Sequence, residues 1–130
     1  MNYNNLTWRH FENPSHAGTL TGGRIRRGAA GSRAEGTWVQ FDLRIGVGDP
    51  KSASRNLILE EVRFLAFASP HVIAVANWVA QEGTGRPARP VLPESVQALR
   101  RRFEVPVEKL GGLLIVEDAW IAAISSPDRQ

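Results

Sequence analysis

Few side chains in this sequence could do chemistry, because its 130 residues include three histidines and no cysteine. Imidazole binds zinc, iron, nickel and copper, so His10, His16 and His71 are candidate ligands of a divalent metal. Their spacing does not favour one shared site. No two of them stand four residues apart on a helix, and Pro14 separates His10 from His16. We therefore expect no cofactor, and a metal held by these histidines is the alternative.

Ser69 and His71 form the other pair whose types suggest chemistry, because a histidine can activate a serine as a nucleophile. Residues two positions apart on a helix point about 200° from each other, so this hydroxyl and imidazole would not meet. The chain also has no Gly-x-Ser-x-Gly sequence, which marks the nucleophile of many hydrolases. We predict no catalytic residue and a protein that is not an enzyme.

The composition is typical of a globular protein with one core. Apolar residues make up 42% of the chain and charged residues 22%, and the length suits a single domain over residues 1–130. No apolar run approaches the roughly 20 residues that cross a bilayer. The N-terminus lacks the basic and apolar segments of a secretory signal. We expect a cytoplasmic protein without a membrane partner.

The positive charge does not predict a nucleic-acid partner. Lysine and arginine number 16 against 13 acidic residues, and the charge is concentrated in residues 24–27 and 100–102. Surfaces that bind single-stranded nucleic acid place aromatic side chains between the basic ones, and neither run has any. We interpret both runs as solvated strand and helix faces.

Hydrophobic periodicity predicts an α+β fold. Apolar residues alternate strictly at Val39, Phe41, Leu43 and Ile45, which is the period of a half-buried strand. Short connections between neighbouring strands favour an antiparallel meander. The expected order is a short helix over 6–11, then strands over 22–30, 38–45 and 57–67, then about three helices packed on one side.

Start signals place the later helices. Ser69 and Pro70 suit the N-cap and first position of one helix, and Pro93 suits the start of the next. Gly111 and Gly112 would each cost a helix roughly 1 kcal/mol relative to alanine. We therefore expect the last helix to start after them, and a close backbone approach at this point is the alternative. The tryptophans at 8, 38, 78 and 120 are expected mostly in the core.

Several strings along the chain, in this order and spacing, resemble the NifU N-terminal family of IscU-type iron–sulfur cluster assembly scaffolds. The resemblance covers nearly the whole chain and implies the α+β fold of that family. It is carried by HFENP at 10–14 with GTL at 18–20, by GAA at 28–30, by 64–79 with its closing Trp-Val, by VEKL at 107–110 and by 117–124.

The resemblance also implies where cluster ligands would stand. Family scaffolds hold a cluster on three cysteines with help from an aspartate or a histidine. The first cysteine position corresponds to Ser32 or Thr37, the second to Ser69, the third to Gly112 and its neighbouring histidine to Gly111. Thiolates are soft anionic donors that bind iron strongly, whereas a serine hydroxyl is a poor ligand and glycine has no side chain.

We therefore predict a degenerate scaffold homologue that has lost its cluster ligands. Its expected role is a non-enzymatic interaction or regulatory module related to iron–sulfur cluster assembly. The alternative is a repurposed metal- or small-ligand-binding protein that uses the emptied site near Ser69, His71 and Gly112.

The resemblance further implies protein partners, namely a cysteine desulfurase and an Hsp70-type chaperone. Family members present a Pro-Pro-Val-Lys string to the chaperone. The corresponding segment has one proline fewer and gains an acidic residue, so it matches the chaperone-binding string poorly. The candidate partner-binding residues are Val105, Pro106, Val107, Glu108 and Lys109.

Overall fold

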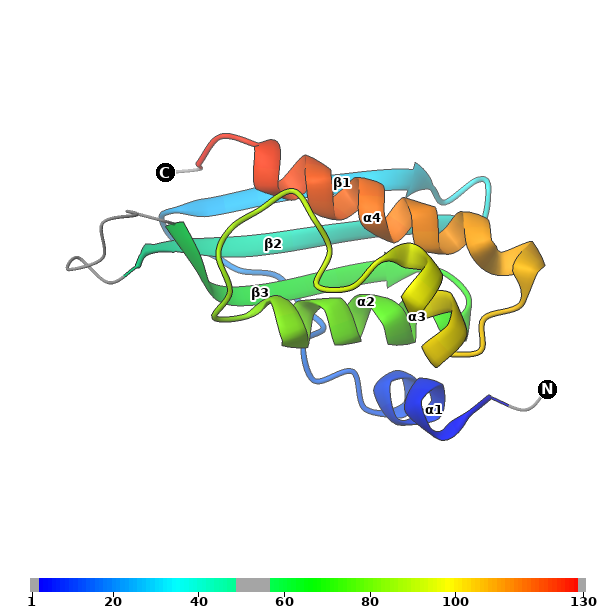
Figure 1. Cartoon of the computed structure of the whole chain (residues 1–130). Coiled ribbons are helices and arrows are strands. Elements are labelled where there is room, and N and C mark those ends of the chain that lie inside the picture. The colour runs from blue at the N-terminus through cyan, green and yellow to red at the C-terminus, as the bar shows by residue number, and fades with distance from the viewer. Residues whose placement is uncertain (1–2, 49–56, 129–130) are drawn as a thin grey trace.

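The computed structural model describes residues 3–48 and 57–128. They form a three-stranded antiparallel sheet with helices packed on one face (Figure 1). The predicted α+β fold is therefore confirmed. In chain order the elements are α1 (Asn5–Glu12), β1 (Ile25–Ser32), β2 (Thr37–Val47), β3 (Leu57–Phe67), α2 (Pro70–Gly83), α3 (Val96–Arg102), the 3-10 turn η1 (Val107–Lys109) and α4 (Leu110–Ser125).

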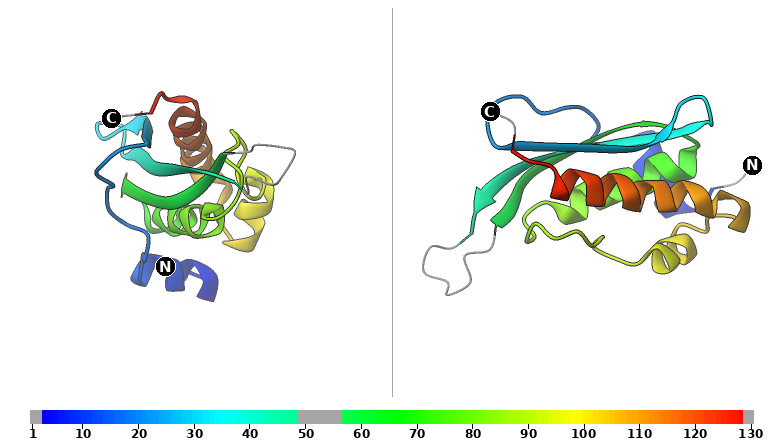
Figure 2. Two further views of the ribbon diagram at one scale, coloured as in Figure 1. Left: turned by 90° about the vertical axis from the view of Figure 1, so that its left-hand side faces the viewer. Right: turned by 90° about the horizontal axis from the view of Figure 1, so that it is seen from above.

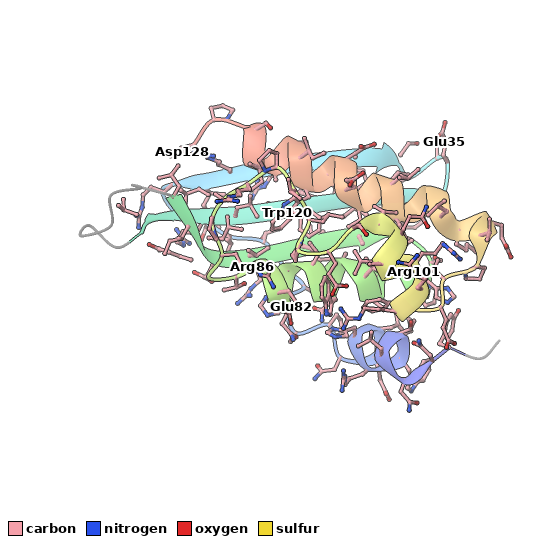
Figure 3. The ribbon with its side chains drawn as sticks, viewed as in Figure 1. Glu35, Glu82, Arg86, Arg101, Trp120 and Asp128 are labelled. Carbon is pink, nitrogen blue, oxygen red and sulfur yellow. The ribbon has the colours of Figure 1, made fainter. Side chains whose placement is uncertain are left out.

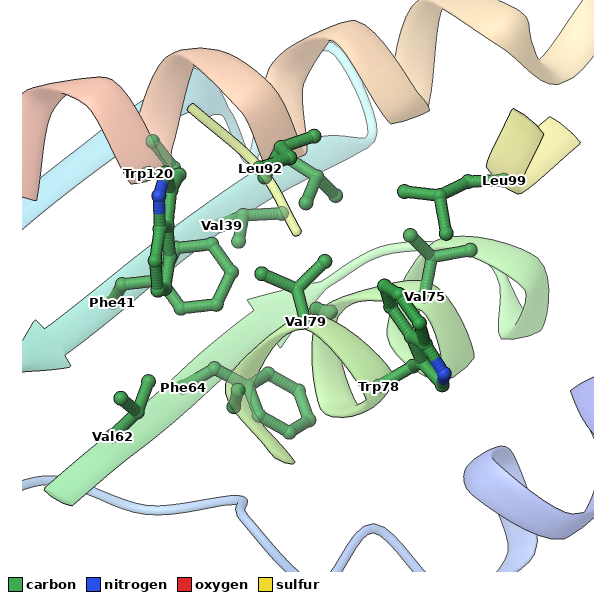
Figure 4. Close-up of a cluster of buried hydrophobic side chains, with 14 of the residues drawn as sticks. Val39, Phe41, Val62, Phe64, Val75, Trp78, Val79, Leu92, Leu99 and Trp120 are labelled. Carbon is green, nitrogen blue, oxygen red and sulfur yellow. The ribbon is translucent and has the colours of Figure 1, made fainter. Parts of the chain in front are cut away.

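The sheet is a meander in the order β1-β2-β3, with β2 in the centre. The alternating apolar residues of β2, from Val39 to Ile45, are buried on the face that α2 and α4 cover. Their burial confirms the strand that the sequence pattern predicted. Beneath α4, the indole of Trp120 lies edge-on to Phe41 with 5.2 Å between ring centroids, and Figure 4 shows this pair in the core. Its Nε1 donates to the backbone oxygens of Arg89 (3.2 Å) and Val91 (3.1 Å), so the buried indole N–H is satisfied.

Two element starts differ from those expected. β1 begins at Ile25 rather than at residue 22, because Arg24 takes a positive φ of 62° that no strand accommodates. α3 begins at Val96 rather than at Pro93. Its N-cap is Ser95, whose Oγ accepts a hydrogen bond from the Ala98 N–H at 3.1 Å.

β1 and α4 approach each other closely where they cross. A Cβ on Gly28 would overlap the backbone of Ala122 and Ala123, so only glycine fits this position of β1. The basic run at 24–27 is also more than a solvated face. Arg26 pairs with Asp128 at 2.7 Å, and Arg27 pairs at 2.7 Å with the buried Asp42.

Residues 13–24 connect α1 to β1 by crossing the sheet face that the helices leave open (Figure 2). Ala17 forms a parallel bridge with Phe64 of β3. The Leu20 N–H then donates to Oδ2 of the buried Asp42 at 2.8 Å, and Leu20 itself is buried. The segment therefore supplies partners to the polar groups on this face. Among the described helices, none is long and apolar enough to cross a membrane.

The tryptophans divide between core and surface. Trp78 and Trp120 are buried, as expected. Trp38 is half-buried, with the Arg33 guanidinium 5.0 Å from the centroid of its ring. Trp8 is 47% exposed on α1, so the expectation of a core position is wrong for this residue. Its neighbours are Phe11, with 6.1 Å between ring centroids, and Tyr3, which stacks on the indole at 6.2 Å.

Candidate functional site

The positions that the sequence resemblance marked as cluster ligands lie at one end of the sheet. A cavity of about 320 Å³ opens there between the β1–β2 turn, the start of α2 and the start of α4, and we call it the hairpin-end cavity. Figure 3 places Glu35 at this turn, at the opposite end of the sheet from Asp128. The lining residues are Glu35, Gly36, Thr37, Ser69, Val72, Glu108, Lys109 and Gly112.

The structure places both alternatives for the first ligand position. Thr37 lines the hairpin-end cavity together with Ser69 and Gly112. Ser32 pairs with Thr37 across the strands, and its Oγ accepts the Glu35 N–H at 3.2 Å within the turn. Of the predicted positions, Thr37, Ser69 and Gly112 therefore come together, whereas Ser32 and Gly111 do not line the cavity.

The donor atoms at the hairpin-end cavity do not suit an iron–sulfur cluster. Thr37 and Ser69 supply hydroxyls, Glu35 and Glu108 supply exposed carboxylates, and Lys109 supplies an ammonium. No thiolate or imidazole lines it. Nor do any three histidine or acidic side chains in the described ranges group closely enough to hold a metal. Since clusters are bound chiefly by thiolates, this donor set fits poorly.

Ser69 stands at the predicted N-cap of α2, but its hydroxyl does not cap the helix. The residue has extended backbone angles and Pro70 follows at the first helical position, as expected. Its Oγ is buried and has no hydrogen-bond partner, so the predicted capping bond is absent. A buried hydroxyl without a partner costs free energy, so the residue type is not explained by helix capping.

The glycine pair lies inside α4, so the expectation of a later helix start is wrong. The helix begins at Leu110 and includes both Gly111 and Gly112. A Cβ on Gly112 would lie 2.5 Å from Cγ2 of Val72, whereas one on Gly111 would meet nothing within 4 Å. The alternative expectation, that another part of the chain approaches the backbone closely here, is therefore confirmed for Gly112. No side chain fits there unless Val72 moves.

His71 is not part of the hairpin-end cavity. It is buried in the first turn of α2, and its ring lies edge-on to Tyr3 with 4.6 Å between centroids. Burial, and after it the charge of Lys109, lower the pKa of His71 from its usual 6.5. The site predicted near Ser69, His71 and Gly112 thus contains the first and third of these residues only.

His10 and His16 meet at a different place, around Asn77 of α2. Asn77 is 1% exposed, and its Oδ1 accepts the backbone N–H of His16 at 2.9 Å. Its Nδ2 lies 2.8 Å from Nδ1 of His10. Burial is the main cause that lowers the pKa of His10, and the charge of Arg9 adds to it. The three histidines therefore do not share one site.

The candidate partner-binding segment is part buried and part exposed. Val105 is buried in the core and Pro106 is half-buried. Val107 is 68% exposed, and Glu108 and Lys109 lie beside it at the cavity. Only the second half of the segment is therefore available to a partner.

Glu35, Gly36 and Val72 line the cavity without having been predicted there, and of these only Glu35 has a polar side chain. It lies in the short turn between β1 and β2, next to Gly36 and Thr37. An acidic residue in a tight turn is usually a solvated turn residue, so its type carries no functional signal. The sequence indicated Glu35 only through its position two residues before Thr37, a candidate cluster-ligand position.

No family model matches this sequence, and no curated protein matches it. Solved structures do match it. One is a protein described as an iron–sulfur cluster assembly scaffold for the SUF system (FiSufU) from the thermophile Fervidobacterium islandicum AW-1, with a TM-score of 0.65 and 8% identity over 95% of this chain and 96% of that one. Another is a hypothetical protein with a TM-score of 0.61 and 12% identity over 92% and 93%. At these identities the likeness concerns the fold alone, and the fold resembles that of the FiSufU protein.

Proposed function

We propose that this protein does not assemble clusters and acts instead as a non-enzymatic interaction or regulatory module related to iron–sulfur cluster assembly. One observation carries the proposal. Thr37, Ser69 and Gly112 converge on one cavity, yet together they offer two hydroxyls and no thiolate. These are positions at which the resemblance implies cluster ligands, but their side chains lack the donors that a cluster needs.

The packing around Gly112 strengthens this proposal. Because a Cβ at this position would approach Cγ2 of Val72 to 2.5 Å, a ligating side chain at the third position would require Val72 to move. The lack of a donor there is thus built into the contact between α2 and α4. A single substitution would not restore a three-donor site.

Exposed apolar residues near the hairpin-end cavity favour a protein partner. Phe67 is two residues before Ser69 and is 53% exposed, and Val107 is two before Lys109 and is 68% exposed. Leu114, in the first turn after Gly111, is 46% exposed. Large apolar side chains at a polar rim are frequent contact residues in protein interfaces. The partners that the resemblance implies are a cysteine desulfurase and an Hsp70-type chaperone.

Anaerobic reconstitution tests the chemical part of the proposal. The purified protein would be incubated with ferrous iron and sulfide, desalted, and analysed for bound iron and visible absorption. We expect a colourless protein without iron. A scaffold that retains three cysteines is the positive control in the same buffer. Stoichiometric iron with charge-transfer absorption would contradict the proposal.

A binding assay with purified desulfurase and chaperone tests the interaction part. We expect one of them to bind, and we expect Val107→Ser to weaken binding by about tenfold, which corresponds to about 1.4 kcal/mol. Val91→Ser is the matched control, because Val91 is also 68% exposed but lines a separate pocket beside Trp120. If neither protein binds, the proposed partners are wrong. Equal losses in both variants would exclude this surface.

A second candidate function is the binding of a small ligand in the hairpin-end cavity. The unpartnered Oγ of Ser69 favours it, since a ligand could satisfy this hydroxyl beside the ammonium of Lys109. Elemental analysis and thermal shift assays with divalent metals and small metabolites test this candidate. Bound metal or ligand that is lost in Ser69→Ala, but not in His71→Ala, would support it. A protein without metal, whose melting temperature no ligand shifts, would exclude it.

A further inference from the structure

A second polar cavity lies between α1 and α2, away from the hairpin-end cavity. Its volume is about 430 Å³, and we call it the α1–α2 pocket. Two of its lining residues are buried polar groups, His10 at 6% and Asn77 at 1% exposure. The full lining is Arg9, His10, Asn13, Ser15, Asn77 and Gln81.

The hydrogen bonds of Asn77 determine which nitrogen of His10 carries the proton. A backbone N–H can only donate, so the group of Asn77 that faces the His16 N–H at 2.9 Å is its oxygen. Its amide nitrogen therefore donates to Nδ1 of His10 at 2.8 Å. Nδ1 then acts as the acceptor of a neutral imidazole, and the proton is on Nε2.

This tautomer leaves one hydrogen-bond donor on His10, a residue that lines the pocket. No acceptor in the described part of the chain bonds to the Nε2–H of His10. Burial lowers the pKa of His10, which keeps the ring neutral with one proton to donate. Asn77 also keeps a second amide hydrogen, since only one is needed for the bond to His10.

The remaining lining residues can also donate hydrogen bonds, because each has an N–H or O–H group. Arg9 is exposed on the last turn of α1 and adds a guanidinium, and Asn13, Ser15 and Gln81 add two amides and a hydroxyl. No carboxylate lines the pocket. The nearby carboxylate of Glu82 lies 3.7 Å from the Arg86 guanidinium, which offsets its charge.

We propose that the α1–α2 pocket binds a small oxyanion, of the phosphate or carboxylate class, with Arg9 and the Nε2–H of His10 as its main donors. A guanidinium matches the oxygen pairs of both classes, and the neighbouring neutral donors would complete the ligand's hydrogen bonds. A cation would meet Arg9 and find no carboxylate. An apolar ligand would leave the polar lining unpaired. The proposal does not depend on the function proposed for the hairpin-end cavity.

An NMR titration of the full chain with inorganic phosphate, and separately with acetate, tests this proposal. Sodium chloride would hold the ionic strength constant, because surface charges attract any anion at low salt. We expect saturable shifts of the backbone amides of residues 9–16 and 77–81 with at least one anion. The anion that binds more tightly distinguishes the phosphate from the carboxylate class.

Two charge-matched variants make the titration decisive. Arg9→Gln should weaken binding by about tenfold, a loss of about 1.4 kcal/mol. Arg101→Gln removes the same charge from an exposed position of α3, shown in Figure 3, and should leave the affinity within about twofold. Equal weakening by both variants would reveal non-specific attraction and overturn the proposal. Shifts that do not saturate with either anion would also overturn it and leave the pocket a purely structural network.

Discussion

The hairpin-end cavity and the α1–α2 pocket are of similar volume, but their polar groups are satisfied differently. At the hairpin-end cavity the buried Oγ of Ser69 has no partner, and the charged groups lie in solvent. In the α1–α2 pocket, Asn77 joins His10 and His16 through two hydrogen bonds at 2.8 and 2.9 Å. The positions marked by the sequence resemblance lie at the first cavity, whereas the connected buried polar groups belong to the second. The place where the resemblance implies a site therefore differs from the place where this chain has a connected network of buried polar groups.

Asn77→Ala should have the largest effect, because it removes the residue that connects the α1–α2 pocket. The His16 N–H and Nδ1 of His10 would both lose their partner. An unsatisfied buried group costs about 1–3 kcal/mol, so we expect a loss of about 3 kcal/mol in the free energy of unfolding. Urea denaturation measures it. Gln81→Ala, an exposed amide on the same helix and pocket, should change stability by less than about 0.5 kcal/mol.

Similar values for Asn77→Ala and Gln81→Ala would contradict the connected network. In that case the two cavities would differ only in that the hydroxyl of Ser69 has no hydrogen-bond partner.

Gly112→Ala, at the hairpin-end cavity, and Gly111→Ala, beside it in α4, should change stability in opposite directions. Alanine stabilises a helix interior by up to about 1 kcal/mol over glycine, and Gly111 has open space for the methyl group. At Gly112 the methyl would press on Val72, a stiff β-branched side chain, and overpacking costs about 1–3 kcal/mol. We expect Gly111→Ala to raise the melting temperature and Gly112→Ala to lower it. A stabilised Gly112→Ala would mean that α2 and α4 can separate at this cavity.

Ser69→Ala should have the smallest effect, because it removes a hydroxyl that bonds to nothing. We expect the free energy of unfolding to stay within about 0.5 kcal/mol of the wild type, or to rise. Ser95→Ala is the matched control at the other serine N-cap and should cost about 1 kcal/mol, since Ser95 accepts the Ala98 N–H. Thermal and urea unfolding of the two variants give the comparison. A cost at Ser69 equal to that at Ser95 would reveal a partner for its Oγ.

The sheet and the helices were predictable where local periodicity is strong. The alternation from Val39 to Ile45 predicted β2, and β3 has the expected bounds of Leu57–Phe67. β1 was misplaced because its sequence is mostly Gly, Ala and Arg, which has no apolar alternation. The need for glycine at position 28 comes from a tertiary contact instead. The backbone of α4 approaches Gly28 so closely that a side chain would not fit.

The candidate sites were only partly predictable, because the contacts that build them are distant in the sequence. Asn77 lies 61 residues from His16 and 67 from His10, so no local pattern links the three. Helix propensity argued against Gly112 in α4, and tertiary packing against Val72 overrode it. The family resemblance marked Ser32 or Thr37, Ser69, Gly111 and Gly112 as ligand positions. The structure brings Thr37, Ser69 and Gly112 to one cavity and leaves Ser32 and Gly111 outside it.

The docking of α1 has a consequence for the order in which the chain is made. Thr7 is buried and donates its hydroxyl to the backbone oxygen of Phe103 at 2.8 Å, across 96 residues. A ribosome adds about 5–20 residues per second, so α1 waits roughly 5–20 s for this acceptor to be synthesised. Until then α1 can pack only on α2, which ends at Gly83 and is therefore made earlier. The last contact of α1 can therefore form only late in synthesis, after the sheet and α2 have been made.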